Sequence, residues 1–381
     1  MFIFLLNYKK MIYFDNSSTN QKPNILFKSS INILQKKNFN LNKGNYNLLD
    51  KNLIFFKKIK FLLKYLIKCN FIEELIFFFN STFSINFIFF NLINFININN
   101  EILISNKEHN SVFISLIKIF KYKKCKIIIF PTIKQNIFLN IICNYINEKI
   151  IFCIINQISN NFGIINKIKN ILSICNYNNI ISIVDITQSI SSLNINIKKI
   201  KPNFLFFSLH KLYSLTGISI LFLNINLLSK IKPLFVGGGS SLIFNYNILY
   251  KKFNEKFYFG TQNIYSLFSS YYSLKWFLSN KKFIFYINLY LKKKSFILFK
   301  KKKIFFTNIF LLKCKNIYNF NMFLDINKII IRCDNLCNFM KNMFINKKNN
   351  CRISINFFNK LKEILKMKFL IFFFNFRIKN Y

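Results

Sequence analysis

A lysine that directly follows a histidine, at the end of an apolar run, is the first candidate for chemistry. Lys211 lies in the segment FFSLHKLYSLTG (206–217), and His210 is one of only two histidines in the chain. A lysine at the end of a buried strand can form a Schiff base with a carbonyl cofactor when its surroundings lower its pKa. Lysines are spread over the whole chain, so Lys211 needs support from other segments before this chemistry is assigned to it.

Three other segments supply groups that such a cofactor would use. Asp185 ends the apolar run ISIVD, and Gln188 follows one helical turn later. A carboxylate among apolar neighbours needs a cation or a proton donor, and a pyridinium nitrogen would be one. His109 opens a loop after the run EILIS, where an imidazole could stack on a planar ring. Ser81 and Thr82 follow another apolar run at a predicted helix start, where hydroxyls and backbone N–H groups can hold a phosphate.

A cysteine near two rare arginines is the candidate nucleophile. Cys337 ends the segment RCDNLC, which begins with Arg332, and Arg352 follows 15 residues after Cys337. The chain has three arginines in all, and an arginine offers bidentate carboxylate binding that a lysine does not. A cysteine reacts as the thiolate. The alternative is a buried thiol beside a structural salt bridge, and for Cys333 core packing is the expected role.

Apolar runs of strand length alternate with longer Lys/Asn-rich stretches. Such runs, buried on both faces, are typical of a parallel sheet covered by helices, and the spacer 164–179 has the length of a helix. After about residue 250 the alternation fades, and only a strand at 329–333 and a helix from Asn359 are predicted, which indicates a boundary near residues 250–270. The six predicted strands of the sheet are 101–105, 125–130, 149–155, 180–185, 203–208 and 218–223.

The composition limits how far the charge can be interpreted. The chain has 381 residues, 52% of them apolar, which is enough to bury a sizeable core, and a formal net charge of +44. It contains no alanine and is built mainly from Asn, Ile, Lys, Phe and Leu, as in a very AT-rich genome. The lysine excess therefore reflects codon usage first. We expect a solvated basic surface rather than a nucleic-acid interface, because no basic block alternates with aromatic residues.

Membrane and secretion signals are weak. The mean hydropathy is +0.28, but Asn or Lys interrupts every apolar run before the length of a membrane span, and residues 75–95 come nearest. The opening MFIFLLNYKK is too short for a signal peptide, and Met11 is an alternative start. Nine cysteines, an odd number, without a secretion signal indicate reduced thiols, so we expect a cytoplasmic protein. From the AT-rich codon usage we expect a bacterial source with a reduced genome.

Taken in order, the segments resemble a known family. The chain resembles the class V branch of the fold-type I pyridoxal-phosphate (PLP) enzymes, and within it the SufS-like cysteine desulfurases and selenocysteine lyases. The segments that carry the resemblance are YFDNSSTNQKP (13–23), NLNKGNYNL (40–48), FFFNSTFSIN (77–86), EILISNKEHNSV (101–112), NQISNNFG (156–163), VDITQS (184–189), FFSLHKLYSLTG (206–217), VGGGSSL (236–242), FGTQN (259–263), RCDNLC (332–337) and CRISINFFN (351–359).

The resemblance implies an α/β fold with two domains. A large PLP-binding domain at 21–260 would hold a mostly parallel seven-stranded sheet. A smaller α+β domain at 261–381 would carry the nucleophilic cysteine and the carboxylate-binding arginine, and residues 1–20 would pack with it. The family forms homodimers with shared active sites.

The resemblance also assigns the cofactor ligands. Lys211 would hold PLP as a Schiff base, Asp185 would pair with its ring nitrogen, Gln188 would sit by the ring oxygen, and His109 would cover the ring face as a catalytic residue. Asn160 would lie near both the ring oxygen and the substrate carboxylate. The phosphate ligands would be Ser81, Thr82, Ser208 and His210, with Thr261 reaching the phosphate from the other subunit.

The implied reaction converts L-cysteine to L-alanine. In the family, the cysteine corresponding to Cys337 takes the substrate sulfur as a persulfide, Lys211 moves the Cα proton, and Arg352, with Arg332, binds the substrate carboxylate. The short spacing between Cys337 and Arg352 favours the SufS-like group. A SufE- or SufU-like acceptor and an iron–sulfur scaffold would then receive the sulfur.

The chain departs from the family pattern at three places, one of which is the early loop, where Asn42 and Lys43 replace a His and an Arg. Asn80-Ser81-Thr82 stands where Gly-Thr-Thr is usual, with Phe83 in place of an acid, and Asn tolerates the backbone of such a turn. RCDNLC has Asn335 and Leu336 where the family has two histidines beside the nucleophile. Three alternatives stay open: a selenocysteine lyase or another class V enzyme, a basic nucleic-acid-binding protein, and an inactive scaffold.

Overall fold

The structure is a computed structural model that describes residues 11–36, 47–120, 123–132, 142–244, 247–298, 307–313, 316–333 and 350–379. The chain divides into two compact units. The large unit comprises residues 22–159 and 166–281, and the small unit comprises residues up to 21, 160–165 and 282–381. The sequence predicts a boundary after residue 260. In the structure the division falls after Lys281, inside helix α9 (Ile264–Leu298). This long helix therefore contributes residues to both units.

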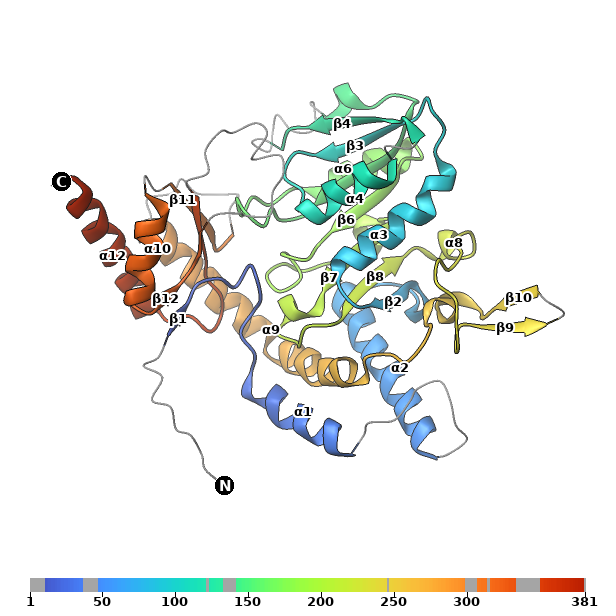
Figure 1. Cartoon of the computed structure of the whole chain (residues 1–381), viewed down its shortest axis with the longest axis horizontal. Helices are drawn as coiled ribbons and strands as arrows, with labels where there is room; N and C mark the ends of the chain where they lie inside the picture. Colours follow the sequence, from blue (N-terminus) through green and yellow to red (C-terminus); the bar gives the residue numbers. More distant parts are fainter. Residues whose placement is uncertain are drawn as a thin grey trace. The chain divides into compact units, whose positions relative to one another are not determined.

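A mostly parallel sheet of seven strands forms the centre of the large unit (Figure 1). Strand β8 runs antiparallel to both of its neighbours, and the other strand pairs are parallel. All six predicted strands are present, and β3, β7 and β8 are buried at every position, as expected for a sheet covered on both faces. The strand order is β2 (Leu75–Phe78), β8 (Ser219–Leu223), β7 (Phe204–Ser208), β6 (Ile181–Asp185), β5 (Ile150–Asn156), β3 (Glu101–Ser105), β4 (Lys126–Phe130).

Helices cover this sheet. Helix α3 (Ser81–Leu92) packs on β7 and β8 and lies beside α4 (Asn110–Phe120). Helix α6 (Ile168–Tyr177) packs on β5 and β6, and its buried residues follow the spacing of one helical face. These buried residues are Ile168, Ile171, Leu172 and Cys175. The helix predicted between residues 164 and 179 is therefore confirmed.

Further elements of the large unit lie outside this sheet and its covering helices. The short strands β9 and β10 pair antiparallel with each other. The elements are α1 (Asn24–Lys36), α2 (Asn47–Ile67), α7 (Ile197–Ile200), α8 (Ile225–Leu228), β9 (Ser241–Phe244) and β10 (Asn247–Tyr250).

The segment that came nearest to a membrane span folds as a strand and a helix. Residues 75–95 form β2 and α3, and the two elements are separated by Asn80, whose side chain caps α3 by accepting a hydrogen bond from the Phe83 N–H at 2.8 Å. Among the helices of the described ranges, none combines the length and apolar character that a bilayer span requires.

The small unit has its own sheet and core. Strand β14 (Asn350–Ser354) lies between β11 (Ile309–Lys313) and β13 (Arg332–Cys333), and all three are antiparallel. Near the N-terminus, β1 (Ile12–Tyr13) pairs in parallel with β12 (Ile329–Ile330). Two helices complete the unit, α10 (Ile317–Ile326) and α12 (Leu361–Lys379).

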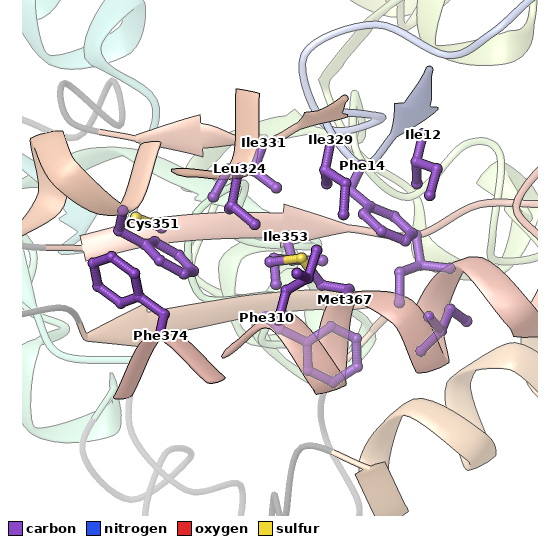
Figure 2. Close-up of a cluster of buried hydrophobic side chains, with 14 of the residues drawn as sticks. Ile12, Phe14, Phe310, Leu324, Ile329, Ile331, Cys351, Ile353, Met367 and Phe374 are labelled. Atoms are coloured by element: carbon purple, nitrogen blue, oxygen red, sulfur yellow. The ribbon is translucent and has the colours of Figure 1, made fainter. Parts of the chain in front are cut away.

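The core of the small unit joins chain segments that are far apart in sequence (Figure 2). Phe14 contributes to it from the N-terminal segment, Phe310 and Ile353 from the sheet, and Met367 from α12, and all four side chains are fully buried. A mostly parallel seven-stranded sheet in one unit and an α+β arrangement in the other confirm the predicted fold class.

Candidate active site

The carboxyl ends of three neighbouring parallel strands bring the main candidates of the large unit to one sheet edge. Asp185 ends β6, where it pairs in register with Asn156 of β5 and Phe206 of β7. Lys211 follows β7 in a short 3-10 turn (Leu209–Leu212) and is 8% exposed. In open α/β sheets ligands bind at this edge, so the strand order itself places the lysine and the aspartate where a cofactor can be held.

Asp185 and Lys211 interact electrostatically. The Asp185 Oδ1 accepts a hydrogen bond from the Thr187 N–H at 2.7 Å. Burial raises the pKa of the Asp185 carboxyl, while the Thr187 hydrogen bonding and the charge of Lys211 oppose that rise. A buried carboxylate whose charge is only partly balanced favours a further cation beside it, and a protonated ring nitrogen is such a cation. The donor set therefore fits PLP.

Two serines and a helix N-terminus form the candidate phosphate site. The Ser81 and Ser208 hydroxyls lie 2.6 Å apart, and the Ser81 N–H donates to the Ser208 Oγ at 3.2 Å. Ser81 is the first residue of α3, so the positive end of this helix dipole faces the pair. Thr82 and Thr261 are both exposed.

Two basic residues lie close to Lys211: His210 within the same turn, and Lys22 beside it. The Lys22 Nζ donates to the His210 carbonyl oxygen at 3.3 Å. Burial lowers the pKa of His210 to about 3, helped by the charges of Lys211 and Lys22, so its imidazole is neutral at pH 7. Burial also lowers the pKa of Lys22 to about 8. A neutral imidazole can donate one hydrogen bond to a phosphate without adding charge.

His109 is held in one tautomer at the start of α4. Its Nδ1 accepts a hydrogen bond from the Ser111 N–H at 3.1 Å and lies 2.8 Å from the Ser111 hydroxyl. A nitrogen that accepts from a backbone N–H carries no proton, so in the neutral ring the proton is on Nε2. Gln188, half-buried in the turn after β6, accepts a hydrogen bond from the Ser192 hydroxyl with its backbone carbonyl at 3.4 Å.

The small unit holds the predicted carboxylate-binding arginines. Arg352 lies in β14 and is 2% exposed, and Arg332 in β13 is its partner in register. The Arg352 Nη2 lies 2.6 Å from the Asp15 Oδ1, and its Nη1 donates to the Asn160 carbonyl oxygen at 3.2 Å. The Arg332 Nη1 donates to the Ser18 hydroxyl at 3.1 Å. The structure thus brings Arg332, Arg352 and Asn160 together within this unit.

Asp15 is a residue of this cluster to which the sequence analysis gave no role. Its backbone carbonyl accepts a hydrogen bond from the Tyr13 hydroxyl at 3.0 Å. Burial and the charge of Asp15 raise the pKa of Tyr13 to about 12, so Tyr13 stays protonated. The scarcity of acids, 12 in 381 residues, was the signal that could have singled out Asp15 in the segment YFDNSST.

Glu108 is the second residue that the sequence analysis passed over. It directly precedes His109 and is fully buried. Its Oε1 accepts hydrogen bonds from the Ser105 hydroxyl and from the Asn156 N–H at 2.7 Å, whereas its Oε2 has no hydrogen-bond partner in the described part of the chain. Burial raises its pKa to about 8, and the charge of Asp185 adds to the rise. Glu108 is therefore mostly a neutral acid at pH 7.

Cys337, with Asn335 and Leu336, lies outside the described residues. The role assigned to it stays a prediction. Of the other predicted site residues, the large unit gathers the lysine, the aspartate, the serine pair and His210 around the ends of β6 and β7, and the small unit gathers the arginines.

Comparison with known proteins decides the family. The model of the class-V aminotransferase family matches residues 12–367. The chain belongs to the class-V aminotransferase family.

Two curated relatives of this class-V aminotransferase carry cysteine desulfurase names. The chain is 33% identical over 314 residues to cysteine desulfurase SufS of Plasmodium falciparum, a match that covers 76% of this chain and 56% of that protein. It is 28% identical over 392 residues to a probable cysteine desulfurase of Borreliella burgdorferi, covering 93% of this chain and 90% of that protein. The resemblance to this group is thereby confirmed.

A solved structure supports the fold. The apo cysteine desulfurase of Thermococcus onnurineus NA1 superposes with a TM-score of 0.89 at 19% identity, covering 95% of this chain and 94% of that chain. At this identity the likeness concerns the fold.

Proposed function

We propose that this member of the class-V aminotransferase family is a PLP-dependent cysteine desulfurase that converts L-cysteine to L-alanine and receives the sulfur as a persulfide on Cys337. The observation that carries the proposal is the buried Lys211 at the end of β7, in electrostatic contact with Asp185 at the end of β6. A lysine, an acid and a hydroxyl-lined helix N-terminus on one sheet edge are the groups that PLP chemistry uses.

Each group has a part in holding the cofactor. Lys211 would bind its aldehyde, Asp185 would keep its ring nitrogen protonated, and the Ser81–Ser208 pair with the N-terminus of α3 would bind its phosphate. His109 would lie over the ring face, and Gln188 and Asn160 near the ring oxygen. When bound, PLP supplies an electron sink that makes the substrate Cα–H acidic.

The remaining chemistry belongs to side chains of the chain. Arg352, oriented by Asp15, would bind the substrate carboxylate, with Arg332 and Asn160 beside it. The Lys211 Nζ would move the proton at the substrate Cα. The Cys337 thiolate would take the substrate sulfur, because a thiolate is the nucleophilic form of a cysteine.

We also propose a homodimer that passes sulfur to a SufE- or SufU-like acceptor for iron–sulfur cluster assembly, in the cytoplasm of a bacterium with an AT-rich genome. A dimer is supported by large apolar side chains exposed on the large unit, which a second copy would cover. Examples are Phe27 on α1, Phe61 and Tyr65 on α2, and Leu249 on β10. Light scattering of the purified protein, with mass measured during gel filtration, tests the dimer.

The first experiment tests the cofactor. Purified protein is mixed with PLP, and the visible absorbance of the lysine-bound cofactor is recorded after free PLP is removed. We expect Lys211→Ala to lose this band and to keep its far-UV circular dichroism. Lys169→Ala, at an exposed lysine of α6, should keep the band. A wild-type protein without the band, or a Lys211→Ala protein that keeps it, contradicts the proposed cofactor site.

The second experiment tests the reaction. Alanine and sulfide are measured after L-cysteine and a thiol reductant are added to the PLP-loaded enzyme. We expect Cys337→Ala to abolish both products while the visible band remains, and Cys143→Ala, at an exposed cysteine, to leave both unchanged. Unchanged product formation in Cys337→Ala would remove that residue from the mechanism. Release of alanine from selenocysteine alone would favour a selenocysteine lyase.

A further inference from the structure

Two cysteines of the small unit face each other across a pair of strands. Cys333 of β13 and Cys351 of β14 are partners in the antiparallel register, and their Sγ atoms lie 3.0 Å apart. Both are thiols in the structure. Side chains that are direct cross-strand partners can be joined without moving either backbone far, which is the geometric requirement for a disulfide.

The two thiols differ in access to solvent. Cys351 is fully buried in the core of the small unit, between Asn350 and the buried Arg352 (Figure 2). Cys333 is half-buried and lies on β13, one of the two outer strands of the described three-stranded sheet. An oxidant arriving from solvent therefore meets Cys333 first, and Cys351 stands behind it as the second thiol.

We propose that Cys333 and Cys351 are a redox-active dithiol that a low-molecular-weight disulfide oxidises to a cross-strand disulfide. The Cys333 thiolate attacks one sulfur of the small disulfide, whose S–S bond breaks and releases one small thiolate. The Cys351 thiolate then attacks the Cys333 sulfur of the mixed disulfide and releases the second small thiolate. Two protein thiols are oxidised, the small disulfide is reduced to two thiols, and the protons of the protein thiols pass to these products.

The two cysteines are sequence neighbours of the two arginines of the small unit. Cys333 directly follows Arg332 and Cys351 directly precedes Arg352, and these arginines are themselves register partners. A disulfide would fasten β13 to β14 one residue away from both arginines. The inference does not depend on the proposed function, because it uses only the two thiols and a small disulfide.

A second cysteine pair provides an internal comparison. Cys153 of β5 and Cys175 of α6 hydrogen-bond to each other through their side chains, and both are buried. Neither thiol is accessible to a small disulfide in the folded large unit. We therefore expect this pair to stay reduced under conditions that oxidise Cys333 and Cys351.

The test is oxidation of the full-length protein by glutathione disulfide, followed by blocking of the remaining thiols and digestion without reductant. Asp-N and Lys-C together place the relevant cysteines in separate peptides: Cys333 in IIIRC (329–333), Cys337 in DNLCNFMK (334–341) and Cys351 in NNCRISINFFNK (349–360). We expect the first and third peptides to be linked by a disulfide. Their combined mass should be about two daltons below the sum of the two reduced peptides, because two hydrogen atoms are lost. Dithiothreitol should reverse the link.

Single variants separate the order of attack from a merely structural effect. In Cys351→Ala, the attack by Cys333 should stop at a mixed disulfide with glutathione. In Cys333→Ser, Cys351 should stay unmodified because it is buried. Circular dichroism reports whether each variant is folded, and Cys351→Ser is the second variant if the alanine form unfolds.

Three results would overturn the proposal. The first is a folded wild-type protein in which Cys333 and Cys351 stay unlinked at every glutathione disulfide concentration that modifies exposed Cys143. The second is a link from either residue to Cys337 in place of the expected one. The third is oxidation of Cys153 and Cys175 at the same rate, because indiscriminate oxidation would show that the cross-strand geometry has no role.

Discussion

Replacing Glu108 by glutamine tests how the large unit accommodates a buried acid beside its candidate cofactor site. Glu108 is fully buried, its Oε1 accepts two hydrogen bonds, and no described cation lies among the groups that set its pKa. The groups that interact with it include Ser105, Asn156, the carboxylate of Asp185 and the thiol of Cys153. Glutamine keeps a carbonyl oxygen for the two hydrogen bonds and removes the titrating proton.

The sign of the effect follows from proton linkage. Folding raises the pKa of Glu108 from an ordinary 4.5 to about 8, so the folded chain binds a proton that the unfolded chain releases. The contribution of Glu108 to the unfolding free energy is therefore greatest below about pH 4.5, and it falls as the pH rises towards 8. At about 1.4 kcal/mol per pKa unit, the loss between pH 5 and pH 7.5 amounts to about 3 kcal/mol. In Glu108→Gln this loss should disappear.

Urea unfolding, followed by the fluorescence of Trp276, measures the unfolding free energy of the large unit, which contains Glu108. Trp276 is the only tryptophan in the chain, and it packs edge-on against Tyr213 in the large unit with ring centroids 5.3 Å apart. The quantity compared is the fall in unfolding free energy from pH 5 to pH 7.5, which we expect to be about 3 kcal/mol smaller in Glu108→Gln than in wild type.

The comparison between the two pH values removes a constant cost of the substitution. The glutamine amide places an N–H group where Oε2 has no described partner, which costs about 1–3 kcal/mol at every pH. Glu148→Gln, at an exposed glutamate of the same unit, should leave the pH dependence unchanged. Equal pH dependence in wild type and Glu108→Gln would refute the reasoning, because it would mean that Glu108 does not carry the proton.

Two further substitutions test the contacts of the candidate site. Asp15→Asn removes the carboxylate beside buried Arg352 and should lower the unfolding free energy of the small unit by about 3 kcal/mol, measured by hydrogen exchange of β14. The control Asp50→Asn, at an exposed aspartate, should leave this free energy unchanged. Full protection of β14 in Asp15→Asn would contradict a stabilising ion pair. Ser208→Ala removes the partner of Ser81 and should weaken PLP binding about tenfold in a fluorescence titration, with unchanged affinity arguing against the serine pair as the phosphate site.

Six of the seven strands, all but β2, were predictable from the sequence because each is a short apolar run bounded by polar residues. Strands β3 and β6 agree with their predicted bounds to within one residue, and α3 begins directly after Asn80 as predicted. Chain order and strand order together then place Asp185 and Lys211 at one sheet edge. Rare residues identified both of them: Asp185 is one of 12 acids, and Lys211 directly follows His210, one of two histidines.

The long helix α9 was not predictable in the same way, whereas the helix predicted from Asn359 is present as α12. Helix α9 runs for 35 residues, but its apolar residues are spread around all of its sides, so no helical period marks it in the sequence. For the same reason the division between the units inside α9 could not be located from the fading of the strand pattern. Residues Asn160–Ile165 belong to the small unit because of their tertiary contacts, which no local sequence pattern predicts.

In a chain with 12 acidic and 56 basic residues, three acids of the candidate site are informative because acids are scarce. Each must have its charge balanced, and the chain does so in three different ways. Asp15 is paired with Arg352, Asp185 is bonded by the Thr187 N–H and faces Lys211, and Glu108 retains its proton. The basic residue that matters at Asp15 and at Asp185 is the one facing the acid, and this distinguishes Lys211 from the other lysines that the codon bias has placed over the surface.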